Sequence, residues 1–100
     1  MSEKVEEKVR ENLKDVIDPE TNFSIVDMGF IYEIDYEEGE VYVEMTLTSP
    51  GCPLHKKFEQ DVERKAKEVE EVEEVEVETV FDPPWKPEMM SEEAREKFGF

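Results

Sequence analysis

The amino-acid sequence predicts an α+β fold in which a three-stranded sheet is covered by helices, in two layers. Apolar residues recur at helical spacing in two long segments and alternate with polar residues in three others, and these segments follow the order α-β-β-α-β, with a short capped helix at the end. One hundred residues suit a single small domain with one modest core. We therefore expect one domain spanning residues 1–100, with the order α-β-β-α-β-α.

The first segment predicts an amphipathic helix over residues 3 to about 16. Its apolar residues lie three or four positions apart: Val5, Val9, Leu13 and Val16. Ser2 is a suitable N-cap. The helix should end before Asp18-Pro19, because the residue before a proline disfavours the helical region. A loop then runs to Gly29, where we expect glycine to relieve a restricted backbone position.

Two alternating segments predict a β-hairpin. In the first strand, Phe30, Tyr32, Ile34 and Tyr36 alternate with Ile31, Glu33 and Asp35. In the returning strand, over residues 41–48, the apolar positions are Val41, Val43, Met45 and Leu47. The short connection Glu37-Glu38-Gly39-Glu40 favours a tight turn between them.

A second amphipathic helix follows, and Pro53 suits its first position, which puts Cys52 at the N-cap. Its apolar stripe is Leu54, Phe58, Val62, Ala66 and Val69. The helix end is poorly marked, because Val72 and Val75 could continue the stripe. The switch to period two places a third strand at about 75–81, and the acidic tract 69–78 is expected to be a solvated helix end and strand face.

The C-terminal part is predicted to be a rigid loop and a short helix. The loop is Asp82-Pro-Pro-Trp-Lys-Pro87, in which Trp85 is expected to cover the core rather than to recognise a ligand. Ser91 is the expected N-cap of the last helix, and Gly99 lies just beyond its end.

Composition excludes several classes of function. With 12 Lys and Arg against 29 Asp and Glu, the net charge of −17 argues against binding to nucleic acid or to an anionic membrane surface. No apolar run is long enough to cross a membrane, and the N-terminus has no apolar signal core. The single cysteine cannot form an intramolecular disulfide, which fits a cytoplasmic protein.

Cys52 is the residue most suited to chemistry. At a helix N-terminus, unpaired backbone N–H groups and the helix dipole lower the pKa of a thiol, which makes it a better nucleophile and metal ligand. Positive charge on His55, Lys56 or Lys57 would act in the same direction. The alternative is that Cys52 is a small, buried and inert apolar residue.

Polar residues are expected beside Cys52. The hairpin brings the start of its first strand and the end of its second to one side of the sheet, so Asp18, Glu20 and Thr48 can share a pocket mouth with it. Asp18 and Glu20 could instead belong to a turn that ends the helix. The threonine hydroxyls could bind a ligand, steady the cysteine loop, or serve only as β-formers. His55 is expected to be solvated, because a zinc site needs about four ligands.

Four motifs in order make the chain resemble the SufT/PaaD-like domain family, which is associated with metal–sulfur cluster biosynthesis. They are Asp18-Pro19-Glu20, Asp27-x-Gly29, Thr46-x-Thr48-x-x-x-Cys52-Pro53 and Asp82-Pro83-Pro84-Trp85. The resemblance covers nearly the whole chain and is greatest to stand-alone prokaryotic members. It implies an α+β fold and a non-enzymatic role in assembling or delivering iron–sulfur clusters. It also implies that Cys52 is the functional thiol and metal ligand, with Asp18, Glu20, Thr46 and Thr48 around it.

The mechanism stays open between two forms. A cluster usually needs four thiolates, so one Cys52 cannot hold it alone, although a homodimer could share a labile cluster between chains. The chain is therefore a transient carrier or an adaptor between the assembly machinery and client apo-proteins. The alternatives are a PaaD-like accessory protein of a multicomponent oxygenase, an enzyme with Cys52 as nucleophile, and a structural interaction module.

Overall fold

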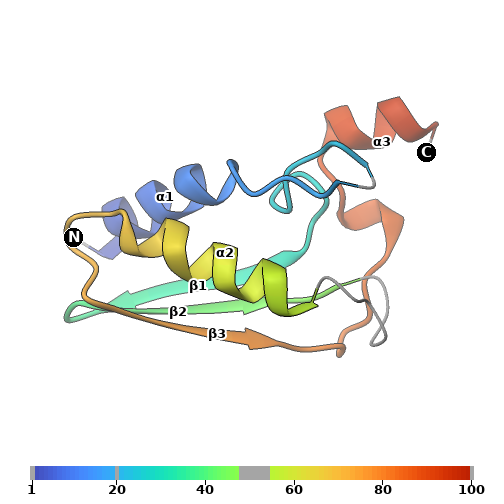
Figure 1. Cartoon of the computed structure of the whole chain (residues 1–100). Helices are drawn as coiled ribbons and strands as arrows, with labels where there is room; N and C mark the ends of the chain where they lie inside the picture. The colour runs from blue at the N-terminus through green and yellow to red at the C-terminus, as the bar shows by residue number, and fades with distance from the viewer. Residues whose placement is uncertain (1, 20, 48–54, 100) are drawn as a thin grey trace.

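The computed structural model describes residues 2–19, 21–47 and 55–99, and its elements follow the predicted order (Figure 1). They are α1 (Ser2–Leu13), β1 (Ile31–Glu37), β2 (Glu40–Met45), α2 (His55–Lys67), β3 (Glu74–Thr79), the short 3₁₀ helix η1 (Pro87–Met89) and α3 (Glu92–Phe98). The α-β-β-α-β-α order is thus confirmed. The predicted start of the second helix at Cys52 and Pro53 lies outside the described residues.

The three strands form one mixed sheet in the order β1-β2-β3. β1 and β2 are the predicted antiparallel hairpin, whereas β3 runs parallel to β2. The parallel pairing follows from the connection, since α2 carries the chain back along the sheet before β3 begins. α1 and α2 lie side by side on the same face of the sheet, so the fold has two layers (Figure 1).

The alternation predicted for the first strand breaks at a β-bulge. Ile31 pairs with Met45 but Glu33 pairs with Glu44, so Tyr32 is an extra residue on β1. An extra residue shifts the alternation by one position, so the residues after it point to the opposite face of the sheet from the one that strict alternation predicts. This explains why Ile31 and Ile34 are both buried although they are three positions apart.

The first helix ends three residues earlier than predicted. After Leu13 the chain continues through two tight turns, in which the amides of Asp15 and Val16 bond to the carbonyls three residues before them. Ile17 then forms an isolated bridge with Ser24. Because these residues pair in an extended conformation ahead of Pro19, they cannot continue the helix.

One hydrophobic core lies between the sheet and the helices. Nearly all the predicted apolar stripes are buried: Val5, Val9, Leu13 and Val16, then Val41, Val43, Met45 and Leu47, then Phe58, Val62, Ala66 and Val69. Val75 and Val77 are only half-buried, because β3 is an edge strand. The chain turns between Val69 and Val72, so the alternative of a continued helix is wrong.

The C-terminal segment folds back against the loop before β1. The Tyr32 hydroxyl donates to the Pro83 carbonyl at 2.7 Å, and the Ser91 amide donates to the Asp27 carbonyl at 2.7 Å. Trp85 is half-buried on the core, as predicted. The capping predictions for α3 are also confirmed, since the Ser91 side chain accepts from the Ala94 amide and Gly99 adopts φ +81°.

Candidate functional site

The polar motifs of the sequence meet at the end of the sheet where β1 begins and β2 ends. A ladder of backbone hydrogen bonds leads across this end: Asp18 to Phe23, Ile25 to Val16, Phe30 to Ile25, and Thr46 to Phe30. The last bond, from the Thr46 amide to the Phe30 carbonyl, is 2.7 Å long. The hairpin therefore brings the Asp18 turn and Thr46 to the same end of the molecule, as the sequence predicted.

Asp18 is the buried residue of a tight turn. Its amide donates to the Phe23 carbonyl, and its own carbonyl accepts the amides of Thr21 and Asn22, at 3.3 and 2.8 Å. Asn22 has φ +63°, which closes the turn in the left-handed region that asparagine tolerates. Asp18 itself is only 7% exposed. Asp18-Pro19 therefore belongs to a turn, as one alternative held, but this turn does not end the helix, because α1 already ends at Leu13. It also holds a buried acidic residue at this end of the sheet.

Thr46 is completely buried directly after β2. Its hydroxyl donates a long hydrogen bond, 3.4 Å, to the Leu47 carbonyl, and its amide is held by Phe30. A hydroxyl with no exposed surface does not face a ligand in solvent. Of the three roles suggested for the threonines, this placement fits support of the loop after β2 better than ligand binding.

Three predicted site residues, Glu20, Thr48 and Cys52, lie outside the described residues. Both flanks of the cysteine segment are described, however, and both lie at this end of the sheet. On one flank, Met45 pairs with Thr79 and accepts the Val80 amide at 2.8 Å. On the other flank, the first turn of α2 is connected to Thr79 through Glu59.

A polar chain at the start of α2 was not found from the sequence. His55 Nε2 lies 2.9 Å from Glu59 Oε2, and the same carboxylate accepts a hydrogen bond from the Thr79 hydroxyl. The side chain of His55 is 39% exposed, so the prediction that it is simply solvated is incomplete. The i,i+4 spacing of His55 and Glu59 was the signal that could have found the pair.

Within the described ranges, no group of three or more His, Cys, Asp or Glu residues converges to hold a metal ion. His55 and Glu59 supply only two such groups. No described helix is long and apolar enough to cross a membrane.

Comparison with known protein families identifies the class to which this two-layer domain belongs. The family model described as "Iron-sulfur cluster assembly protein" matches residues 6–78, and the chain belongs to this family. The resemblance indicated by the four motifs is thereby confirmed.

The similarity to several named relatives covers most of the chain. The Fe-S protein maturation auxiliary factor YitW of Bacillus subtilis is 37% identical over 100 residues, covering 99% of this chain and 98% of its own. The Fe-S protein maturation auxiliary factor SufT of Staphylococcus aureus is 40% identical over 85 residues, 84% of this chain and 97% of its own. A longer relative, the iron-sulfur cluster carrier protein of Synechocystis, is 35% identical over 72% of this chain and 20% of its own.

The fold is shared with a solved structure. The crystal structure of a domain of unknown function, DUF59, from Bacillus anthracis has a TM-score of 0.90 and 39% identity, covering 99% of this chain and 95% of that one. This similarity confirms the α+β fold over nearly the whole length.

Proposed function

We propose that this chain is a maturation factor for iron–sulfur proteins that acts through the thiol of Cys52, as an adaptor or as a transient carrier of the cluster. Membership of the assembly family and the names of its relatives support a role in iron–sulfur maturation rather than catalysis. The cluster is cargo in this proposal. Its partners would be the assembly machinery and client apo-proteins in the cytoplasm.

The observation that carries the proposal is the anchoring of both flanks of the cysteine segment at one end of the sheet. Thr46 is held there by Phe30, and α2 is held there through Glu59 and Thr79. A thiol between two fixed anchors can be presented repeatedly in one place, which exchange of a cluster between proteins requires. Asp18 and Thr46 would support that segment, with Glu20 and Thr48 beside the thiol.

Ligand number decides how firmly a cluster could be held. A single thiolate from each chain leaves most of the usual four positions to other groups. A homodimer would supply two thiolates, and the rest would come from a client or a small thiol. Such a cluster would be labile, which suits transfer, and the adaptor form needs no cluster at all.

Client maturation tests the proposed role of Cys52. Cells lacking their own maturation factor would be complemented with the wild type, Cys52→Ser or Glu7→Gln, and the activity of their iron–sulfur enzymes measured. We expect Cys52→Ser to fold as the wild type by circular dichroism and to leave maturation at the level of the empty vector. Glu7→Gln changes an exposed residue of α1 and serves as the control that retains function. Full maturation by Cys52→Ser would refute the proposal.

Anaerobic reconstitution separates the carrier from the adaptor. The wild type and Cys52→Ser would be incubated with iron and sulfide, and visible absorption, iron content and oligomeric state compared. Substoichiometric iron that requires Cys52 and elutes with a dimer identifies a carrier. Equal iron in both proteins, together with loss of maturation in Cys52→Ser, identifies an adaptor.

Rapid alkylation of native Cys52 would fit both forms. Alkylation only after denaturation would instead support the inert structural alternative.

A further inference from the structure

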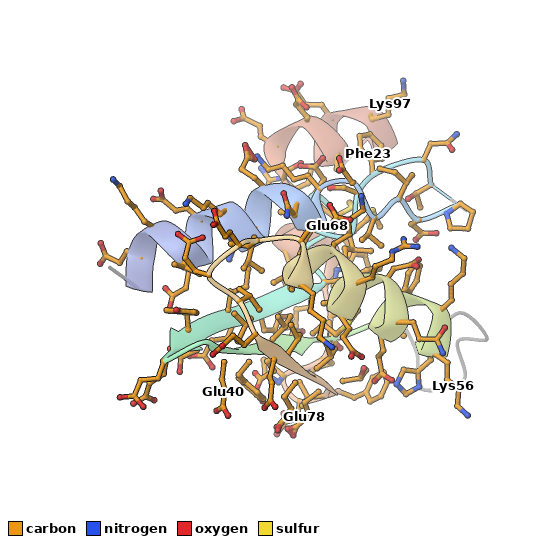
Figure 2. All side chains as sticks on the ribbon, turned by 60° about the vertical axis from the view of Figure 1, so that its left-hand side comes forward. Phe23, Glu40, Lys56, Glu68, Glu78 and Lys97 are labelled. Carbon is orange, nitrogen blue, oxygen red and sulfur yellow. The ribbon has the colours of Figure 1, made fainter. Side chains whose placement is uncertain are left out.

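The face of the sheet opposite α1 and α2 is not covered by any element in the described part of the chain (Figure 1). Its outward side chains follow from the strand register: Glu33, Asp35 and Glu37 on β1, Glu40, Tyr42 and Glu44 on β2, and Glu74, Glu76 and Glu78 on β3. Figure 2 shows Glu40 and Glu78 pointing away from the helices. We call these nine residues the acidic face, because eight carboxylates surround a single tyrosine.

The register places like charges directly opposite one another. Glu44 lies between Glu33 and Glu78, and Glu40 lies between Glu37 and Glu74. Directly opposed carboxylates on neighbouring strands repel each other and destabilise a sheet. The acidic face therefore opposes folding, and a local conflict of this kind is expected where a surface serves a function.

The cations of the chain do not neutralise the acidic face. Every ion pair found between described residues joins side chains of the helices or of the turns beside them, such as Lys8 with Glu71 and Lys65 with Asp15. On the sheet itself, the Tyr42 hydroxyl lies 3.1 Å from Glu44 Oε2 and 3.2 Å from Glu78 Oε2. One hydroxyl has one proton, so it can donate to only one of these carboxylates at a time.

We propose that the acidic face is a docking surface for a lysine- and arginine-rich segment of another protein. A hollow of about 300 Å³ lies on this face, lined by the side chains around Tyr42, among them Asp35, Glu40 and Glu76. Its carboxylates match an ammonium or guanidinium group, and the phenol ring beside them offers a surface to which such a cation is attracted. The proposal does not depend on the role of Cys52.

Two other occupants fit the acidic face less well. A divalent cation needs several oxygens converging on one point, and no described group of three carboxylates does so. A second copy packed face to face would set carboxylates against carboxylates. Three strands about 4.8 Å apart and six residues long offer only about 300 Å² of projected surface, so the contact would be small, transient and sensitive to salt.

Amide NMR with an oligolysine and an oligoarginine peptide as probes tests this inference. We expect saturable shifts confined to residues 33–44 and 74–78. The variant Glu40→Gln/Glu74→Gln/Glu76→Gln should lose about tenfold or more in affinity, since each exposed charge pair contributes modestly. The matched control, Glu7→Gln/Glu88→Gln/Glu96→Gln, removes the same charge from exposed positions elsewhere and should lose less than about twofold.

Three results would overturn the proposal. Equal loss of affinity in the two triple variants would mean that the peptides sense net charge only. Amide chemical-shift changes spread over α1, α2 and α3 would also mean that the peptides sense net charge only. Saturable, tight shifts of the acidic face with Mg²⁺ or Ca²⁺ alone would identify a cation site instead. Client maturation by the first triple variant would be measured separately, so that loss of docking is not confused with loss of the Cys52 role.

Discussion

The indole nitrogen of Trp85 donates a hydrogen bond to the main-chain carbonyl of Met28, 2.7 Å away. The Trp85 and Phe30 rings also make a T-shaped contact, with ring centroids 5.8 Å apart. The main-chain carbonyl of Phe30 in turn accepts a hydrogen bond from the Thr46 amide. We expect Trp85→Phe to lower the free energy of unfolding by about 1 kcal/mol through loss of the hydrogen bond. Trp85→Ala should lower it by about 2–3 kcal/mol, less than for a fully buried tryptophan.

Urea unfolding followed by circular dichroism measures both Trp85 variants. The control is Lys86→Ala, an exposed neighbour that should change stability by no more than about 0.5 kcal/mol. If Trp85→Phe matched this control, the hydrogen bond to Met28 would contribute nothing to stability.

Two glycines with similar backbone angles allow the cost of a steric clash to be measured apart from the cost of an unfavourable backbone conformation. Gly29 has φ +77° and Gly99 has φ +81°, so an alanine is strained at either position. A Cβ on Gly29 would lie 2.2 Å from the carbonyl oxygen of Met89, whereas one on Gly99 would meet nothing within 4 Å. We expect Gly99→Ala to cost about 1 kcal/mol and Gly29→Ala at least about 3 kcal/mol. Similar losses of stability for the two variants would contradict the close contact between Gly29 and η1.

The Tyr42 phenol is expected to lose its proton at a higher pH than an ordinary tyrosine does. Its desolvation, together with its hydrogen bonding to one or the other of Glu44 and Glu78 and the negative charge of both, raises its pKa from 10.0 to about 12. Because the pKa is raised in the folded state, the stabilising contribution of the neutral phenol is complete below pH 10 and is lost as the pH rises through 12. Ultraviolet titration of the phenolate, with Tyr42→Phe subtracted, measures this pKa. In Glu44→Gln/Glu78→Gln it should move back toward 10.0, and an unchanged value would rule out the carboxylates as a cause.

Periodicity predicted most of the fold, because burial of one apolar stripe per element dominates it. Val9, Leu13, Val43 and Val62 are wholly buried where the patterns placed them. What the patterns missed depends on contacts between distant segments. The bulge at Tyr32 arises where that residue leaves the ladder, and its hydroxyl bonds to Pro83, fifty-one positions away.

The candidate site was predicted in outline only. Hairpin geometry placed Asp18 and Thr46 at one end of the sheet, since antiparallel strands must bring those ends together. The complete burial of Thr46 did not follow from its β-propensity, because that propensity does not specify how deeply a side chain is buried. Glu59 and Thr79 meet only because β3 returns parallel to β2, a pairing that no local pattern specifies.

Relief of like-charge repulsion should stabilise the sheet. Glu40 lies opposite both Glu37 and Glu74, and no hydrogen bond or ion pair of its side chain is found among the described residues. Glu40→Lys turns two repulsive pairs into two attractive ones, so we expect a gain of about 0.5–1.5 kcal/mol in the free energy of unfolding at low salt. Glu88→Lys makes the same change of charge at an exposed position off the sheet and should gain less.

Salt then distinguishes local pairing from a general effect of net charge. Urea unfolding at low and high ionic strength should show the gap between Glu40→Lys and Glu88→Lys narrowing as salt screens the exposed charges. Glu40→Lys should also weaken the binding of oligolysine, because it places a cation beside the hollow at Tyr42. A protein that became more stable and lost peptide binding together would show that the acidic face trades stability for docking. A gain no larger than that of Glu88→Lys would show that the opposed carboxylates do not strain the sheet.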